Sequence, residues 1–144
     1  MYTVKKLAHM AGVNPETIRF YEKQGVLPEP TRGKNGYRLY DDKTLHRLKF
    51  ILNAKALGFS LDEIEELLQL NQADKKMGYR DARKLTMNKI QDMKRRIGQL
   101  EQMVRVLESL HDDCKKNATD DYCPIIDAFN DGDRKLCGRR DDNN

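Results

Sequence analysis

The stretch TVKKLAHMAGVNPETIRFYEKQG, residues 3–25, predicts two short helices joined by a tight turn. Thr3 can cap a first helix, which Gly12 ends, because glycine tolerates the left-handed conformation at a helix C-terminus. Asn14 followed by Pro15 is an N-cap with proline at the first helical position, so a second helix should run to about residue 24 or 25. Together they predict a helix-turn-helix, with small and aliphatic residues at the positions where such helices meet: Ala8, Gly12 and Ile18.

Residues 31–40 have the features of a small β-wing. Prolines and glycines punctuate the chain here, and Asn35-Gly36 is the strongest short signal for a hairpin turn. The run from Tyr37 to Tyr40 alternates in character, as a strand does. A hairpin at this place would expose three cations: Arg32, Lys34 and Arg38.

Two further helices are predicted before residue 72. Asp41 can cap the first, which Gly58 ends, and Ser60 with Glu63 forms a capping box for the second. Their apolar positions recur at helical spacing and should face a core: Leu45, Leu48, Ile51, Leu52 and Leu57 in the first helix, and Leu61, Ile64, Leu67 and Leu68 in the second. Residues 1–72 are therefore predicted to form a winged helix-turn-helix domain in a mainly α chain.

A hinge and a long dimerisation helix are predicted over residues 73–113. The polar segment from Asn71 to Gly78 indicates the hinge, and no proline occurs from about Arg80 to Asp113. Apolar residues recur there in steps of three and four, the spacing of a coiled-coil seam: Ile90, Met93, Ile97, Leu100, Val104, Leu107 and Leu110. A helix of ~50 Å, at about 1.5 Å per residue, needs a partner for its apolar face. We therefore expect a homodimer, parallel or antiparallel.

Residues 114–130 should form a cysteine loop and a short helix, followed by a mobile tail over residues 131–144. The long helix is expected to end near residue 113, so that Cys114 and Cys123 bracket a polar loop. These two and Cys137 are the three cysteines of the chain, and all lie in its last 31 residues. An odd number without a secretory signal does not indicate a disulfide framework. Thiolate chemistry is therefore expected at this end of the chain.

Charge and composition narrow the function class. The chain has a net charge of +4, but residues 1–60 carry 11 Lys/Arg against 5 Asp/Glu, which leaves a net −2 on the rest. A basic N-terminal region favours a nucleic-acid partner. No apolar run reaches membrane-spanning length and no apolar signal segment follows the first lysines, so we expect a cytoplasmic protein without membrane contact. No nucleotide-binding, nucleophile or clustered catalytic motif is present, which argues against an enzyme.

Three runs, in order along the chain, resemble the MerR family of bacterial regulators. They are ETIRFYE at 16–22, GYRLY at 36–40 and LGFSLDEI at 57–64, and the long helix with its cysteine loop extends the resemblance to about residue 130. The resemblance implies a dimer bound to a double-stranded promoter whose spacer is too long for RNA polymerase. On effector binding such a protein bends and untwists the DNA so that the promoter elements realign.

The resemblance also assigns DNA-contacting residues. In the recognition helix these are Thr17, Arg19 and Tyr21, and in the wing they are Arg32, Tyr37, Arg38 and Tyr40. An alternative for Tyr37 and Tyr40 is that their rings pack the wing onto the domain, which would not exclude a phosphate contact by the hydroxyl.

The metal-responsive branch of the family implies an effector site at Cys114 and Cys123. That branch places a further cysteine at the start of the long helix, where this chain has Tyr79. Two thiolates suit a soft ion with linear ligation, so the effector is expected to be Hg(II) or a Cu(I)-class ion, Cu(I), Ag(I) or Au(I). Zinc would need further ligands, which His111 and Cys137 could supply.

Two other functions stay open from the residues alone. The cysteine pair could react with an oxidant or an electrophile, or the regulator could respond to another small molecule. Alternatively, the chain could be an architectural protein that binds DNA without switching.

Overall fold

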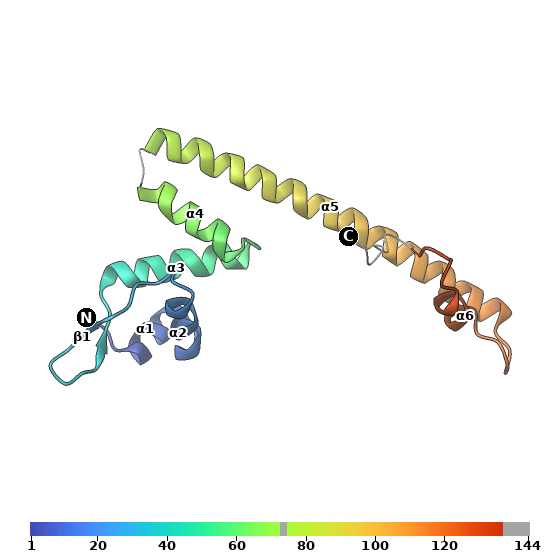
Figure 1. Ribbon diagram of the computed structural model, residues 1–144, viewed down its shortest axis with the longest axis horizontal. Helices are drawn as coiled ribbons and strands as arrows, with labels where there is room; N and C mark the ends of the chain where they lie inside the picture. Colours follow the sequence, from blue (N-terminus) through green and yellow to red (C-terminus); the bar gives the residue numbers. More distant parts are fainter. Residues whose placement is uncertain (73–74, 137–144) are drawn as a thin grey trace. The chain divides into compact units, whose positions relative to one another are not determined.

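The computed structural model describes residues 1–72 and 75–136 and is mainly helical, as predicted (Figure 1). The chain forms two compact units, Met1–Leu85 and the residues from Thr86 onward, which are described in turn. Within the described residues, none of the helices is both long and apolar enough to span a membrane.

The first unit begins with the predicted helix-turn-helix. Helix α1 spans Val4–Ala11 and helix α2 spans Pro15–Lys23. The hydroxyl of Thr3 accepts a hydrogen bond from the N–H of Lys6 at 3.2 Å, and Gly12 ends α1 with φ of 73°. The carboxamide of Asn14 caps α2. Both helices therefore begin where their capping residues predicted.

The wing is a two-stranded antiparallel hairpin, β1 (Thr31–Arg32) and β2 (Arg38–Leu39). Gly36 has φ of 75°, a left-handed conformation that glycine adopts readily in a hairpin turn. Two backbone hydrogen bonds join Tyr2 and Tyr40, with N···O distances of 2.7 and 2.8 Å, so the end of the wing is tied to the start of the chain.

Two helices complete the domain, α3 (Asp42–Ala56) and α4 (Leu61–Gln72). The Asp41 carboxylate accepts hydrogen bonds from the N–H and the hydroxyl of Thr44, both at 2.8 Å, and these hold the pKa of Asp41 below its ordinary value. The predicted capping box is present: Ser60 N–H donates to Glu63 Oε1 at 2.9 Å, and Glu63 N–H donates to Ser60 Oγ at 3.2 Å.

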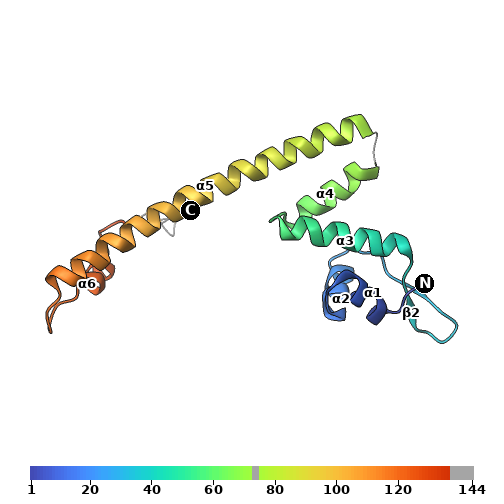
Figure 2. The ribbon, with the colours of Figure 1, turned by 180° about the vertical axis from the view of Figure 1, so that it is seen from behind.

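The core lies where α1 to α4 and the end of the wing meet (Figure 2), and its most buried side chains are Leu7, Ile18, Leu27, Tyr40, Leu48, Ile51 and Ile64. One predicted core residue is misplaced. Leu57 is 67% exposed, because α3 ends at Ala56 and the following turn directs Phe59 into the core instead.

Helix α5 spans Lys75–Asn117 and is longer at both ends than the predicted 80–113. The segment expected to be a hinge is helical from Lys75, and Cys114 lies in the last turn of α5 rather than after it. The prediction failed because polar residues at a helix end show no apolar periodicity, although lysine and methionine are good helix formers.

The start of α5 packs against α4 within the first unit. Gly78 is buried, and a Cβ added there would lie 2.5 Å from the carbonyl oxygen of Leu70. The glycine therefore allows the two helices to approach closely.

The second unit consists of the main part of α5 and helix α6 (Pro124–Asn130), which lies beside the last turns of α5 (Figures 1 and 2). An isolated bridge between Thr119 and Tyr122 closes the connecting loop. Leu110, Pro124 and Ala128 are buried in this unit, so Leu110 is covered within its own chain and does not extend the exposed seam.

Candidate functional site

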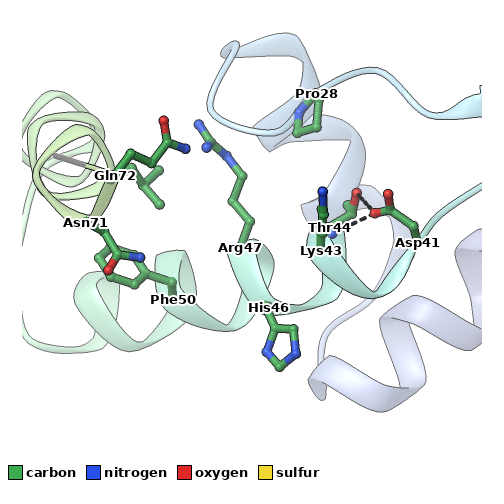
Figure 3. A pocket seen from close by; sticks show the side chains of 10 residues that line it. Pro28, Asp41, Lys43, Thr44, His46, Arg47, Phe50, Asn71 and Gln72 are labelled. Carbon is green, nitrogen blue, oxygen red and sulfur yellow. Dashed lines mark hydrogen bonds between the residues drawn. The ribbon is translucent and has the colours of Figure 1, made fainter.

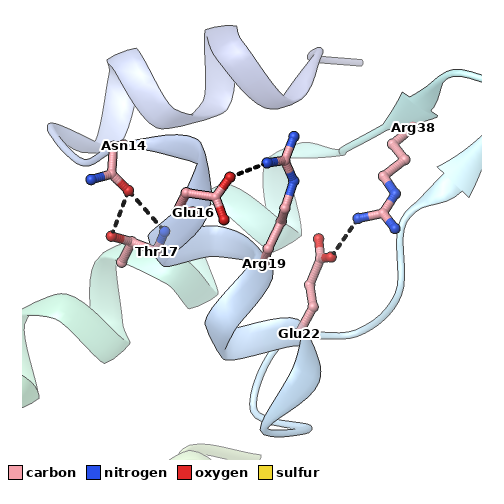
Figure 4. Close-up of polar contacts among 6 residues, drawn as sticks. All are labelled: Asn14, Glu16, Thr17, Arg19, Glu22 and Arg38. Carbon is pink, nitrogen blue, oxygen red and sulfur yellow. Dashed lines mark hydrogen bonds and ion pairs between the residues drawn. The ribbon is translucent and has the colours of Figure 1, made fainter.

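Helix α2 presents Arg19 to solvent and uses Thr17 in its own cap (Figure 4). Arg19 forms an ion pair with Glu16, and both side chains are more than half exposed. A pair of this kind contributes only ~0.2–1 kcal/mol, so a phosphate can compete with Glu16 for the guanidinium. Thr17 donates its N–H and its hydroxyl to Asn14 Oδ1, at 2.9 and 3.1 Å.

A buried carboxylate connects α2 to the wing. Glu22 Oε2 accepts a hydrogen bond from Arg38 at 3.0 Å, and Glu22 Oε1 accepts one from the hydroxyl of Tyr40 at 2.5 Å. The side chain of Glu22 is 9% exposed, whereas that of Arg38 is 40% exposed. Burial and the hydrogen bond to Glu22 raise the pKa of Tyr40 to about 12, so its hydroxyl stays protonated and donates.

The recognition helix and the wing enclose a cleft of about 280 Å³. Four cations and two carboxylates line it, together with Pro30: Arg19, Lys23, Arg32, Arg38, Glu22 and Glu29. The excess of cations suits a DNA phosphate, whose neutralisation by Lys and Arg supplies most of the sequence-independent affinity.

The structure separates the predicted tyrosine contacts. Tyr37 is 73% exposed on the wing, next to Arg32, whose guanidinium donates to the carbonyl oxygen of Gly36 at 3.1 Å. Tyr40 is 1% exposed and its hydroxyl donates to Glu22, so its ring packs in the domain as in the alternative interpretation, and a phosphate contact by its hydroxyl stays a prediction. The ring of Tyr21 is also in the core, and burial raises its pKa; a contact from its hydroxyl to DNA stays a prediction.

Sequence reasoning missed four residues of the cleft: Glu22, Lys23, Glu29 and Pro30. Lys23 could have been found from its place in the last turn of a basic recognition helix. Glu22 gave a weaker signal, an acidic residue in an element that should bind DNA, and its partners lie 16 and 18 residues further along the chain.

A second hollow of about 460 Å³ lies on the first unit, between Pro28, α3 and the end of α4 (Figure 3). Figure 3 shows Arg47 rising from α3 between Pro28 and Gln72, and its Nε donates to the carbonyl oxygen of Val26 at 2.6 Å. None of the predicted site residues lines this hollow. It therefore lies apart from the expected DNA-contacting surface.

In the second unit, the fold brings Cys114 and Cys123 together. Both are partly buried and neither forms a disulfide. Burial, followed by the influence of Cys123, raises the pKa of the Cys114 thiol. The pKa of Cys123 is lowered, chiefly by the backbone amides of Ile126 and Ile125 at the start of α6 and also by a hydrogen bond with Cys114. Cys123 is therefore the thiol that ionises first.

No third ligand joins this pair in the part of the chain that the structure describes, where no group of three or more His, Cys, Asp or Glu side chains could hold a metal ion. His111 is exposed on α5, and Tyr79 is 61% exposed near the start of that helix. Cys137 lies outside the described residues. The described residues therefore offer a two-thiol site, and a zinc site that also uses His111 and Cys137 stays a prediction.

The predicted dimer seam is exposed along α5 in the single chain. Its six members are between 37% and 60% exposed: Ile90, Met93, Ile97, Leu100, Val104 and Leu107. A row of large apolar side chains open to water is the surface expected of a helix that lacks its partner.

Comparison with known proteins identifies relatives of both units. Residues 2–71 match the family described as MerR HTH family regulatory protein, and residues 45–110 match the one described as MerR, DNA binding. The mercuric resistance operon regulatory protein of Bacillus cereus is 41% identical over 128 residues, which are 89% of this chain and 96% of the relative.

Two solved structures of similar fold are metal complexes. The transcription regulator PbrR691 from Ralstonia metallidurans, in complex with lead(II), has a TM-score of 0.78 and 32% identity, covering 90% of this chain and 99% of its own. MerR from Bacillus megaterium, in complex with mercury(II), has a TM-score of 0.68 and 36% identity, covering 89% and 98%.

Proposed function

This chain belongs to the MerR family of helix-turn-helix regulatory proteins, and on that premise we propose that it is a dimeric promoter-binding regulator that responds to a soft metal ion held by Cys114 and Cys123. The observation that carries the proposal is the pairing of these two thiols at one end of α5 without a third ligand in the described residues.

The DNA-binding surface of the proposal is the recognition helix with the wing. Arg19, Arg32 and Arg38 line a cleft with an excess of cations, and Tyr37 is exposed on the wing. We assign phosphate or base contacts to these four, and to Thr17 and Tyr21 a smaller part. The proposed DNA-binding domain spans residues 1–72. Residues 73–113 form the proposed hinge and dimerisation helix, residues 114–130 the effector loop and short helix, and residues 131–144 a tail.

The proposed dimer is formed by the apolar seam of α5 in two copies. Residues of the seam at 90, 93, 97, 100, 104 and 107 repeat with the spacing of a coiled coil, and all are exposed in the single chain. Since most of the stability of a long helix comes from burial of its apolar face, a second copy accounts for a helix of 43 residues.

The proposed effector is an ion that accepts linear ligation by two thiolates, Hg(II) or a Cu(I)-class ion. Relatives named above are a mercuric resistance regulator and complexes with lead(II) and mercury(II). Tyr79, where a third thiolate is expected in the metal-responsive branch, favours two-coordinate binding here. The lowered pKa of Cys123 favours the thiolate form, which is the form that binds a metal.

The proposed switch acts through DNA shape in the cytoplasm. The dimer would bind a promoter with an overlong spacer, and effector binding would bend and untwist the DNA so that RNA polymerase can engage both promoter elements. Such a regulator changes transcription while it stays bound. A protein that only binds DNA architecturally would not.

A second candidate effector is an oxidant or electrophile. The opposite pKa shifts of Cys123 and Cys114 favour it, because one thiol is available for attack while its neighbour can resolve the product as a disulfide. The two candidates differ in the product they leave, a metal thiolate or an oxidised thiol.

Anaerobic metal competition on the purified, reduced dimer tests the proposal. Hg(II), Cu(I) and Zn(II) are allowed to compete for the protein. We expect one soft ion to bind per Cys114/Cys123 pair and no zinc to remain bound. Cys114→Ser or Cys123→Ser should abolish activation by metal in promoter transcription while DNA binding is intact. Cys137→Ser, which removes the third thiol, is the matched control and should respond as wild type. Activation that survives both serine variants in the pair would contradict the two-thiol site.

Tyr79→Cys tests the coordination number. Supplying a third soft donor should change the thiolate-to-metal absorption of the Hg(II) protein and strengthen the response to Cd(II) or Pb(II). Tyr79→Phe removes only the hydroxyl and should behave as wild type. An identical Hg(II) spectrum in Tyr79→Cys and wild type would show that position 79 does not reach the site.

A further inference from the structure

Glu22 is a carboxylate in a surface built to bind an anion. It lies in the recognition helix and lines the cleft between α2 and the wing, among Arg19, Arg32 and Arg38. By charge alone such a residue should weaken DNA binding, because it repels the phosphate that the neighbouring arginines attract.

The geometry of Glu22 differs from that of an ordinary surface glutamate. Its side chain is only 9% exposed, and each carboxylate oxygen has its own donor, Arg38 at 3.0 Å and Tyr40 at 2.5 Å. A buried carboxylate is costly unless it is paired and hydrogen-bonded, so Arg38 is held against it. Tyr40 is itself fixed, since its ring is 1% exposed and its backbone pairs with Tyr2.

The contact with Glu22 orients the guanidinium of Arg38 but occupies only part of its hydrogen-bond donors. It has five N–H donors in a planar fork, and the contact with Glu22 is made through one of its terminal nitrogens. The side chain is 40% exposed and lines the cleft. The remaining donors can therefore bind a phosphate while the first contact is kept.

We propose that Glu22 is a positioning residue for DNA binding, which holds Arg38 of the wing across the cleft so that the guanidinium meets a backbone phosphate. The inference rests on the proposed function, because it requires Arg38 to contact DNA. It predicts that removal of a negative charge from the DNA-facing cleft weakens DNA binding.

The test measures affinity of the full chain for a mixed-sequence duplex over a series of salt concentrations, since phosphate contacts do not depend on sequence. Arg38→Ala should reduce the slope of log K against log salt by about 0.9 per protomer, which at about 0.1 M salt is roughly an eightfold loss per protomer. Glu22→Gln keeps an acceptor for Tyr40 but removes the charge that holds Arg38, and it should weaken binding by at least about threefold.

Glu29→Gln is the matched control, because Glu29 is an exposed carboxylate that lines the same cleft. It should leave binding unchanged or tighten it. In the Arg38→Ala background Glu22→Gln should have no further weakening effect, since the residue that it positions is gone. Circular dichroism of each variant checks that the domain is folded.

Tyr40→Phe is a second variant for the case in which Glu22→Gln does not fold. This variant keeps every charge and removes only the Tyr40 hydroxyl that donates to Glu22. It should therefore weaken DNA binding when Arg38 is present and not in the Arg38→Ala background. Tighter binding by Glu22→Gln, or equal weakening with and without Arg38, would overturn the positioning role while the proposed function stands. No effect of Arg38→Ala on the salt slope would also overturn the positioning role, since Arg38 would then not contact a phosphate.

Discussion

Leu100 lies in the middle of the exposed seam of α5 and is 60% exposed in the single chain, so its replacement by glutamate tests whether a second copy covers the seam. Full burial of a leucine side chain contributes ~1.5–3 kcal/mol. Since about three-fifths of Leu100 is still open, burial against a partner should contribute ~1–2 kcal/mol per copy, or ~2–4 kcal/mol per symmetric dimer. The dimer Kd should then rise about 30- to 700-fold, before the cost of burying a carboxylate is added.

Sedimentation over a range of protein concentrations measures this change. Leu100→Glu should appear as monomer where wild type is dimer, and the helical circular dichroism signal should fall, because an unpaired long helix loses most of its stabilising burial.

Gln99→Glu is the matched control for Leu100→Glu. It adds the same charge at the preceding, exposed position, which a step of about 100° turns away from the seam. Its dimer should be as stable as wild type. If Leu100→Glu forms a dimer at the same concentrations as Gln99→Glu, the seam is not the interface and the reasoning from its exposure is refuted.

Three further predictions follow from contacts within each unit. Alkylation of the reduced protein near neutral pH should modify Cys123 before Cys114, because the pKa of Cys123 is lowered and that of Cys114 is raised; peptide mass spectrometry gives the order, and the reverse order would contradict the assignment. The pKa of Tyr40 is raised from 10.0 to about 12, so its contribution to stability is complete below pH ~10 and is lost as the pH rises toward ~12. Urea unfolding of wild type should therefore weaken more steeply over that range than unfolding of Tyr40→Phe, and parallel curves would exclude the linkage. Gly78→Ala should lower the Tm, since a Cβ placed 2.5 Å from a backbone carbonyl oxygen costs about 1–3 kcal/mol, more than the gain of up to ~1 kcal/mol in helix propensity. A raised Tm would contradict this prediction, because it would mean that α4 and α5 move apart to accept the methyl group at little cost.

Local sequence patterns predict where the four helices of the winged domain begin. Thr3, Asn14, Asp41 and Ser60 each bond a group three residues further along the chain, so these caps depend only on local spacing. The apolar seam of α5 could also be predicted from the sequence, because a repeat in steps of three and four is a property of a single helix. The ends of α5 could not, since the polar residues there give no periodic signal.

Which polar side chains share a site depends on how distant parts of the chain pack together. Arg38 and Tyr40 reach Glu22 from 16 and 18 residues away, and the burial that makes this carboxylate a fixed partner depends on the wing closing over α2. Likewise, burial and then Cys123 raise the pKa of Cys114, and both depend on α6 lying beside the last turns of α5. Local patterns fix helices through bonds between near neighbours, whereas burial and pKa depend on what packs against a residue from distant parts of the chain.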